Sequence, residues 1–343
     1  MRETLYLALF LSTFLSLPWE TTATTTFSLP ATTMSGSGEN CTCGQANRGH
    51  RIVNGEETEV NEYPWIAGLV SAGRGVVWCG ATLISNQWVL TAAHCTDTAA
   101  PADIEILLGE HDYYEEDETI SLRMEVAEIF NHPKYDTETV DYDFSLLRLS
   151  DPVDFAMYPH IRPICLPADP SEDYIGFLAI VAGWGATSQA GPTSNYLQSA
   201  EVNVLSNAEC NGDEYAYAGA ITDRMLCANV EGGGTDSCQG DSGILRTNIK
   251  QKETCLIVGG PLITPNPDLH ELIGVVSWGY GCAQDYAPGV YARVTKVLSW
   301  ISRTTFDSWS SCPRCEDPAD CPGEVVVGPV TGKIKQYKSV LFV

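Results

Sequence analysis

The chain of 343 residues is long enough for one large all-β domain with appendages, or for two small domains. Its hydrophobic fraction of 44% can fill a core and excludes a chain that is disordered throughout. The formal net charge of -25 argues against nucleic acid and anionic membrane surfaces as partners. It favours cationic partners, although such acidity also serves solubility alone.

Residues 1–23 are predicted to be a secretory signal peptide. Arg2 gives a positive start, a short apolar run covers 5–17, and Pro18 and Glu20 end that run. The run is too short to cross a bilayer comfortably, and no later segment is apolar enough to do so. We therefore expect a secreted, extracellular protein.

Residues 24–51 begin with a Thr- and Ser-rich stretch that is predicted to be a flexible linker. Asn40 opens an Asn-Cys-Thr triplet, which is the acceptor pattern for N-glycosylation. The chain has 13 cysteines, and in a secreted chain such a number predicts a disulfide framework. The odd count leaves at least one cysteine free or paired between molecules.

Short β-like runs separated by Gly, Pro, Asn and Asp fill residues 52–305, which is typical of β-barrels or a sandwich. Examples of the β-like runs are 76–79, 88–91, 104–108, 144–149 and 273–278.

The end of the chain has a different character. Segment 294–302 lacks Gly and Pro and is predicted to be a closing helix. Residues 306–343 form a tail that contains cysteines and prolines.

Three motifs carry residue types used in nucleophilic catalysis. His94 follows Thr-Ala-Ala, Asp143 opens an apolar run, and Ser242 is the serine of Gly-Asp-Ser-Gly. Singly, each motif is ordinary, because a lone His is more often structural and Gly-Asp-Ser-Gly is a common turn. An Asp that opens an apolar run can be buried, and a buried carboxylate needs a donor such as an imidazole N–H. Asp141 is a rival carboxylate, but the run begins directly after Asp143, so we prefer Asp143.

Together these motifs resemble the chymotrypsin/trypsin family of serine proteases, including its secreted arthropod members, whose triad has the same chain order. The resemblance covers about residues 52–303 and implies an all-β fold of two six-stranded antiparallel β-barrels with a short C-terminal helix. Other segments match the family pattern in order: Arg51-Ile52-Val53-Asn54-Gly55, Tyr63-Pro64-Trp65, Trp78-Cys79-Gly80, Gly183-Trp184-Gly185, Ser277-Trp278-Gly279 and Pro288-Gly289-Val290-Tyr291.

The resemblance implies a serine endopeptidase with a role for each triad residue. Ser242 is the implied nucleophile, and His94 is the general base that later returns the proton to the leaving amine. Asp143 holds the imidazole in the correct tautomer. The backbone N–H groups of Gly240 and Ser242 form the implied oxyanion hole.

Asp236 lies where this family has the base of the pocket for the side chain before the scissile bond. Gly279 and Gly289 match the walls of that pocket and carry no side chain that would block entry. A carboxylate in an open slot requires a cationic partner. The expected substrates are therefore proteins or peptides cleaved after Arg or Lys, and protease inhibitors are further expected partners.

Arg51 and Ile52 match the family's activation junction, so the chain is predicted to be a zymogen. Cleavage frees the α-amino group of Ile52, which the resemblance pairs with the Asp241 carboxylate to order the oxyanion loop and the pocket. Because Arg51 precedes the cut, the expected activator is another trypsin-like protease or the enzyme itself.

The family pattern also implies disulfide pairs and a light chain that stays attached. Cys165 is expected to bond Cys41 or Cys43 and so to hold residues 24–51 after cleavage. The other implied pairs are Cys79–Cys95, Cys210–Cys227 and Cys238–Cys282.

No cofactor or metal is expected. Some family members bind calcium in a loop near residues 110–118, but this acidic stretch is not a clean ligand pattern, and we prefer a solvated acidic loop. Cys312 and Cys315 form a Cys-x-x-Cys without a second pair at the spacing of a zinc site.

One departure from the family pattern follows the nucleophile. The usual Gly-Asp-Ser-Gly-Gly-Pro breaks at Ile244 and resumes at Gly260, so residues 244–259 form an insert. Three interpretations stay open: a loop that projects outward, a splice variant or retained intron, or a catalytically impaired homologue that acts as a binding protein. A long loop costs little chain entropy, but a misplaced nucleophile is costly. The intact triad, Asp236 and activation junction favour a working enzyme.

Overall fold

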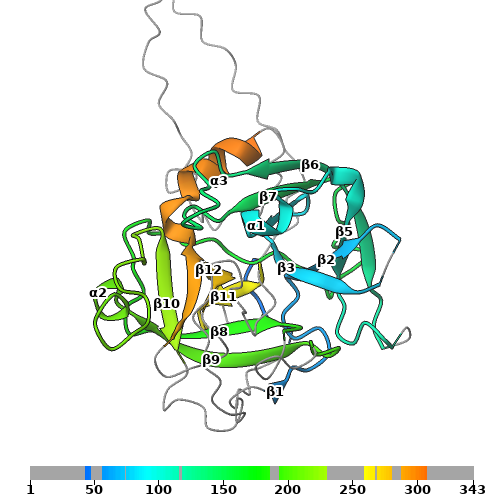
Figure 1. The fold of residues 1–343 in the computed structure, drawn as a ribbon. Coiled ribbons are helices and arrows are strands. Elements are labelled where there is room, and N and C mark those ends of the chain that lie inside the picture. Colours follow the sequence, from blue (N-terminus) through cyan, green and yellow to red (C-terminus); the bar gives the residue numbers. More distant parts are fainter. Residues whose placement is uncertain are drawn as a thin grey trace, which may run out of the picture. The chain divides into compact units, whose positions relative to one another are not determined.

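The computed structural model describes residues 43–47, 56–73, 75–115, 118–185, 193–229, 259–266, 269–279 and 287–306. All of these described residues belong to one compact unit. Most of the regular structure in these ranges is antiparallel β-strand (Figure 1). Within them, no helix has the length and apolar composition needed to cross a membrane.

The first barrel closes six antiparallel strands in the order β2-β3-β4-β7-β6-β5, with β5 pairing back to β2. Buried aliphatic and aromatic residues recur along these strands, so their side chains pack inside the barrel, and closure leaves no free sheet edge. The strands are β2 (Ile66–Ser71), β3 (Val77–Leu83), β4 (Trp88–Thr91), β5 (Ile104–Leu108), β6 (Leu122–Asn131) and β7 (Ser145–Leu149).

The second barrel is also a closed ring of six strands. Its order is β9-β10-β13-β12-β11-β8, and β8 pairs with β9 to complete the ring, while β1 (Glu56–Glu57) adds to the start of β9. The predicted fold of two six-stranded antiparallel barrels is therefore confirmed. The strands are β8 (Leu178–Gly183), β9 (Gln198–Leu205), β10 (Met225–Asn229), β11 (Pro261–Ile263), β12 (Leu272–Trp278) and β13 (Gly289–Arg293).

The helices are short, and the closing helix begins later than predicted. Segment 294–302 was expected to be helical, but Val294–Lys296 is a 3-10 turn (η2) and the α-helix α3 covers Leu298–Thr305. Val294 and Thr295 are β-branched and buried, so they follow β13 in a tight turn instead of opening the helix. The other helical segments in the described ranges are α1 (Ala93–Thr96), η1 (Pro101–Asp103) and α2 (Asn207–Cys210).

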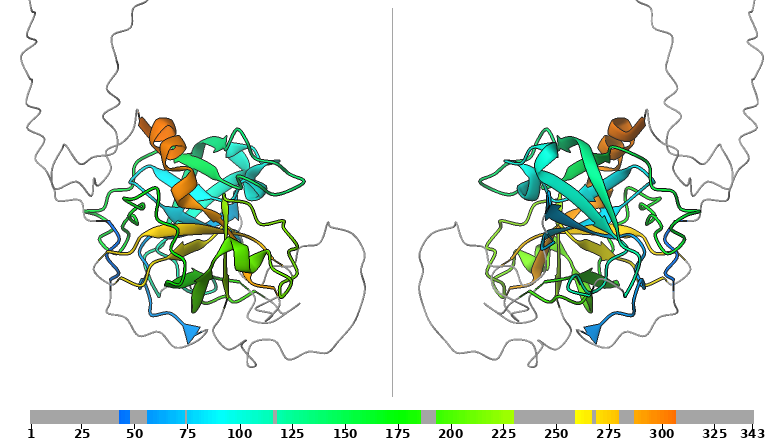
Figure 2. Two further views of the ribbon diagram at one scale, coloured as in Figure 1. Left: turned by 90° about the vertical axis from the view of Figure 1, so that its left-hand side faces the viewer. Right: turned by 90° about the vertical axis from the view of Figure 1, so that its right-hand side faces the viewer.

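The barrels share a core, and α3 reaches from the second to the first. Trp184, directly after β8, is fully buried, and its indole N–H donates to the His111 carbonyl of the first barrel at 2.7 Å. Figure 2 shows α3 continuing from β13 to lie beside strands of the first barrel. There, the Trp300 ring lies 4.8 Å from the ring of His132.

Three disulfides brace the described residues: Cys43–Cys165, Cys79–Cys95 and Cys210–Cys227. Of the two partners left open for Cys165, the structure uses Cys43. Backbone bonds continue this contact, because the Gly44 N–H donates to Pro163 at 2.9 Å and the His270 N–H donates to Gly44 at 2.8 Å. Segment 43–47 is thus fixed to the barrels.

Candidate active site

His94 and Asp143 meet at one end of the first barrel. Strands β4 and β7 pair up to Thr91 and Ser145, so the residues just outside this pair, on α1 and before β7, come together. The His94 Nδ1 lies 2.7 Å from Oδ2 of Asp143, and the His94 backbone N–H donates to Oδ1 at 2.9 Å. The two contacts fix the ring and the carboxylate relative to each other.

Asp143 is only 1% exposed, and a buried carboxylate of this kind needs several donors. A third donor is the Ser277 hydroxyl on β12, at 2.5 Å from Oδ2. Because the carboxylate accepts, Nδ1 of His94 carries the proton and Nε2 is the basic nitrogen. The sequence indicated the Ser277-Trp278-Gly279 motif but gave Ser277 no role.

Asp141, the rival carboxylate, points to a different partner. Its Oδ2 lies 2.5 Å from Nη2 of Arg224, and its Oδ1 accepts from the Thr222 hydroxyl at 2.8 Å. Burial alone would raise the pKa of Asp141, but the hydrogen bonds from Arg224 and Thr222 outweigh it and hold this pKa below its usual range. The structure therefore brings Asp143, and not Asp141, to His94.

Gly279 and Gly289, the predicted pocket walls, lie side by side. A Cβ on Gly279 would stand 3.9 Å from Cα of Gly289 and 4.0 Å from the Tyr217 hydroxyl. A side chain on Gly279 would therefore enter the space between them without forcing the backbone apart. The other predicted site residues fall outside the described residues: Asn40, Arg51, Ile52, Asp236, Cys238, Gly240, Asp241, Ser242 and Cys282.

One cluster of potential metal ligands occurs in the described residues, and it does not form a metal site. Cys79, His94 and Cys95 have donor atoms within 4.8 Å of one another. The two sulfurs are bonded to each other, so they are not thiolate ligands. The disulfide instead packs beside the imidazole, with the Cys95 sulfur 3.9 Å from Nε2 of His94.

Acidic side chains of the 110–118 stretch bind nearby amides. Glu118 accepts the Asp112 backbone N–H at 3.1 Å, and Asp112 accepts that of Tyr114 at 2.9 Å and the Asn195 side-chain amide at 3.2 Å. Burial raises the pKa of Glu110. These bonds tie the loop to the second barrel through Asn195.

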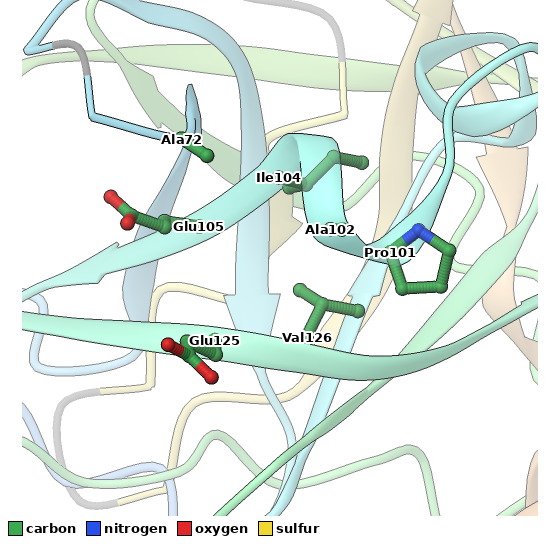
Figure 3. Close-up of a pocket in the computed structure, with 7 residues that line it drawn as sticks. All are labelled: Ala72, Pro101, Ala102, Ile104, Glu105, Glu125 and Val126. Atoms are coloured by element: carbon green, nitrogen blue, oxygen red, sulfur yellow. The ribbon is translucent and has the colours of Figure 1, made fainter.

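A hollow of about 340 Å³ lies on the first barrel, between β5, β6 and η1 (Figure 3). Two carboxylates, Glu105 and Glu125, stand beside it as direct cross-strand partners, and Arg123 pairs with Glu105 at 3.3 Å. None of the residues that line it belongs to the predicted catalytic or substrate-binding set. It is a feature of the barrel wall.

A histidine held by a buried aspartate, in a chain of two antiparallel barrels, is an arrangement found in serine endopeptidases. The model of the family described as Trypsin matches residues 52–243 and 258–301. The chain therefore belongs to the trypsin family of serine proteases and is a serine endopeptidase.

Curated relatives agree with this assignment. "Trypsin 5G1" of Aedes aegypti is 38% identical over 255 residues, which cover 74% of this chain and 85% of that protein. "Serine proteinase stubble" of Drosophila melanogaster is 38% identical over 264 residues, 73% of this chain but 30% of that protein. "Suppressor of tumorigenicity 14 protein homolog" of Bos taurus is 38% identical over 268 residues, which cover 76% of this chain and 29% of that protein.

The family match skips residues 244–257, which lie inside the insert expected from the sequence. Beyond the gap, Gly259 has a φ of +86°, and a Cβ there would stand 2.4 Å from the Gly80 carbonyl oxygen and from the Thr91 hydroxyl. Only glycine fits such a position. The chain is thus closely packed against the first barrel where the match resumes.

Proposed function

We propose that this chain is a secreted zymogen of a serine endopeptidase that cleaves after Arg or Lys, with His94, Asp143 and Ser242 as its triad. The observation that carries the proposal is the buried Asp143, which holds His94 with two hydrogen bonds in a chain of the trypsin family. Its substrates are proteins or peptides, as for the family.

In the proposed reaction, the Ser242 hydroxyl attacks the scissile carbonyl and His94 takes its proton on Nε2. The oxyanion that develops accepts hydrogen bonds from the backbone N–H groups of Gly240 and Ser242. Each such donor lowers the activation barrier by about 3 kcal/mol. His94 then protonates the leaving amine, and water hydrolyses the acyl-enzyme by the same route. Side chains and backbone supply every group, so the chemistry requires no cofactor.

Specificity for Arg or Lys rests on Asp236 at the base of the pocket between Gly279 and Gly289. The two glycines are adjacent, and neither puts a side chain into the space between them. A guanidinium pairs with a carboxylate in bidentate fashion, whereas an ammonium acts as a point charge. Arg substrates are therefore expected to be preferred to Lys substrates.

Zymogen activation follows from cleavage between Arg51 and Ile52, by another trypsin-like protease or by the enzyme itself. The new α-ammonium of Ile52 would pair with Asp241 and order the oxyanion loop. Residues 24–51 would stay attached as a light chain, and the Cys43–Cys165 bond supports this, because it joins the light-chain segment to the protease domain at 52–305.

Secretion is proposed from the signal sequence at 1–23, from the glycosylation triplet at Asn40 and from the disulfides. Disulfides persist in oxidising extracellular environments and are rare in the cytosol. The tail at 306–343 adds further cysteines and is proposed to lie outside the protease domain.

A silent, partner-binding homologue is the second candidate function. The observation that favours it is the interruption of the family match at 244–257, directly after Gly243 and the nucleophile. A displacement of about 1 Å at the nucleophile can lower the rate about a hundredfold.

The decisive experiment measures hydrolysis of an Arg-amide chromogenic peptide after cleavage at Arg51. A variant without 244–259 is measured beside it, and it leaves Gly243 to take the constrained glycine position before Gly260. Activity in both supports the enzyme and a tolerated loop. Activity in the deletion alone favours the silent homologue, and activity in neither overturns the proposed protease function. His94→Ala is the inactive control.

A further inference from the structure

The backbone directly before Asp143 adopts an unusual conformation for its residue types. Tyr142 has a φ of +53° and Val140 a φ of +60°, in the left-handed region that bulky and β-branched residues rarely adopt. The Phe144 N–H donates to the Tyr142 carbonyl at 2.8 Å, which closes a three-residue turn with Asp143 at its centre. The direction of the Asp143 carboxylate thus depends on the conformation of Tyr142.

The Tyr142 ring is held by contacts from outside this turn. It stacks on the ring of His132, with centroids 4.6 Å apart and planes at 6°. The guanidinium carbon of Arg224 lies 5.3 Å from the ring centroid and Lys134 Nζ lies 5.4 Å from it, both within cation–π range. None of these contacts uses the Tyr142 hydroxyl.

The residues that hold the ring are themselves anchored. His132 donates its backbone N–H to Phe144 at 2.8 Å, accepts the Lys134 backbone N–H on Nδ1 at 3.2 Å and packs against Trp300 of α3. Arg224, directly before β10, binds the Asp141 carboxylate through Nε and Nη2. The end of β6 and the start of β10 thus both fix the Tyr142 ring.

We propose that Tyr142 is a positioning residue for catalysis: its clamped ring stabilises the left-handed turn that directs the Asp143 carboxylate at His94 and Ser277. The inference rests on the proposed role of Asp143 in the triad. Without the ring, most L-residues at this position relax toward negative φ, and the carboxylate then turns away from Nδ1 of His94.

Three substitutions separate the ring from the backbone. Tyr142→Phe keeps the stack and the cation contacts, so its kcat should stay within about twofold of the parent. Tyr142→Ala loses them and disfavours positive φ, so its kcat should fall about tenfold or more with little change in KM. Tyr142→Asn also loses the ring but tolerates the left-handed region, so its kcat should lie between those two.

A spectroscopic readout makes the test independent of turnover. The proton on Nδ1 of His94 should give a strongly deshielded proton NMR resonance, assigned by its loss in His94→Ala, because it is shared with a carboxylate at 2.7 Å. We expect this resonance in the parent and in Tyr142→Phe, and its shift or loss in Tyr142→Ala. Tyr114→Ala, which truncates a tyrosine that is 70% exposed and distant in sequence, is the matched control.

An unchanged kcat and resonance in a folded Tyr142→Ala protein would overturn the inference, as would a Tyr142→Phe protein as impaired as Tyr142→Ala. If Tyr142→Ala does not fold, Tyr142→Asn decides, because a resonance and kcat equal to those of the parent would show the ring to be dispensable. An inactive parent with the expected pattern of resonances would count against the proposed protease function and not against this inference.

Discussion

At the scale of single residues, a side chain of the second barrel supports the His94–Asp143 pair of the first barrel. Ser277 is on β12, and its hydroxyl adds the third hydrogen bond to a carboxylate that is 1% exposed. A hydrogen bond to a buried charge contributes about 1.5–3 kcal/mol, more than a neutral one. Ser277 therefore helps to hold the Asp143 carboxylate in place beside His94.

Ser277→Ala is expected to lower kcat/KM about tenfold, because about 1.4 kcal/mol of the lost hydrogen bond would be felt in the transition state. The measurement is steady-state hydrolysis of the Arg-amide peptide, with Ser277→Thr as the control that keeps a hydroxyl. An alanine variant as active as the parent would contradict a role for Ser277 at the site.

A substitution at Gly279 tests the proposed substrate pocket. In Gly279→Val, the new side chain should be accepted by the fold, because a Cβ there meets only ordinary contacts of 3.9 to 4.0 Å, but it should fill the proposed substrate slot beside Gly289. We expect kcat/KM for the Arg-amide peptide to fall at least about tenfold. Labelling of Ser242 by a small organophosphonate should be unchanged, since that probe does not need the slot, and equal loss in both assays would indicate general damage.

At the scale of elements, α3 and the end of β6 meet around one neutral histidine. His132 is buried against Trp300 and Tyr142, and its Nδ1 accepts the Lys134 N–H at 3.2 Å. Burial, together with the nearby positive charges of Lys134 and Arg303, lowers the pKa of His132 to about 4, although Asp141 opposes this shift. Protonation of His132 would turn Nδ1 from an acceptor into a donor, and that donor would face the Lys134 backbone N–H.

The pH dependence of stability follows from this shift. An unfolded histidine has a pKa near 6.5, so between pH 6.5 and 4 the unfolded chain binds the proton more readily than the fold. The contribution of neutral His132 to the free energy of unfolding is complete above pH 6.5 and is lost as the pH falls toward 4. Denaturant unfolding should therefore show a steeper loss of stability over this range in the parent than in His132→Phe. Parallel pH profiles would contradict this account.

At the scale of the whole molecule, local motifs predict the fold and the central pair better than they predict the supporting contacts. His94 and Asp143 stand in short patterns with a fixed chain order, and strand pairing of β4 with β7 joins them. The pairing of Asp141 with Arg224, 83 residues away, arises only when the barrels are packed, and no sequence pattern marks it. The left-handed backbone at Tyr142 is equally hidden, because tyrosine gives no signal for it.

The same limit explains the helix boundary and the partner of Cys165. The sequence places a helix near the end of the domain, but the burial of Val294 decides where it begins, and burial is a tertiary property. The spacing of Cys41 and Cys43 leaves either sulfur available in sequence. The structure selects Cys43 because the adjacent Gly44, with a φ of +69°, lies against His270, where a Cβ would stand 2.4 Å from the His270 carbonyl oxygen.

This attachment gives a prediction for the activated molecule. After cleavage at Arg51, the light chain should remain bound through Cys43–Cys165, so one band on a non-reducing gel should become two on reduction. Cys43→Ala should release the disulfide but not all of the contact, because Gly44 still bonds Pro163 and His270, and Asn47 bonds the Asn61 and His160 carbonyls at 2.8 and 2.9 Å. The light chain of that variant should co-elute with the protease domain in native gel filtration and separate in denaturant. Co-migration of both chains after denaturation without reductant in Cys43→Ala would mean that another cysteine carries the link.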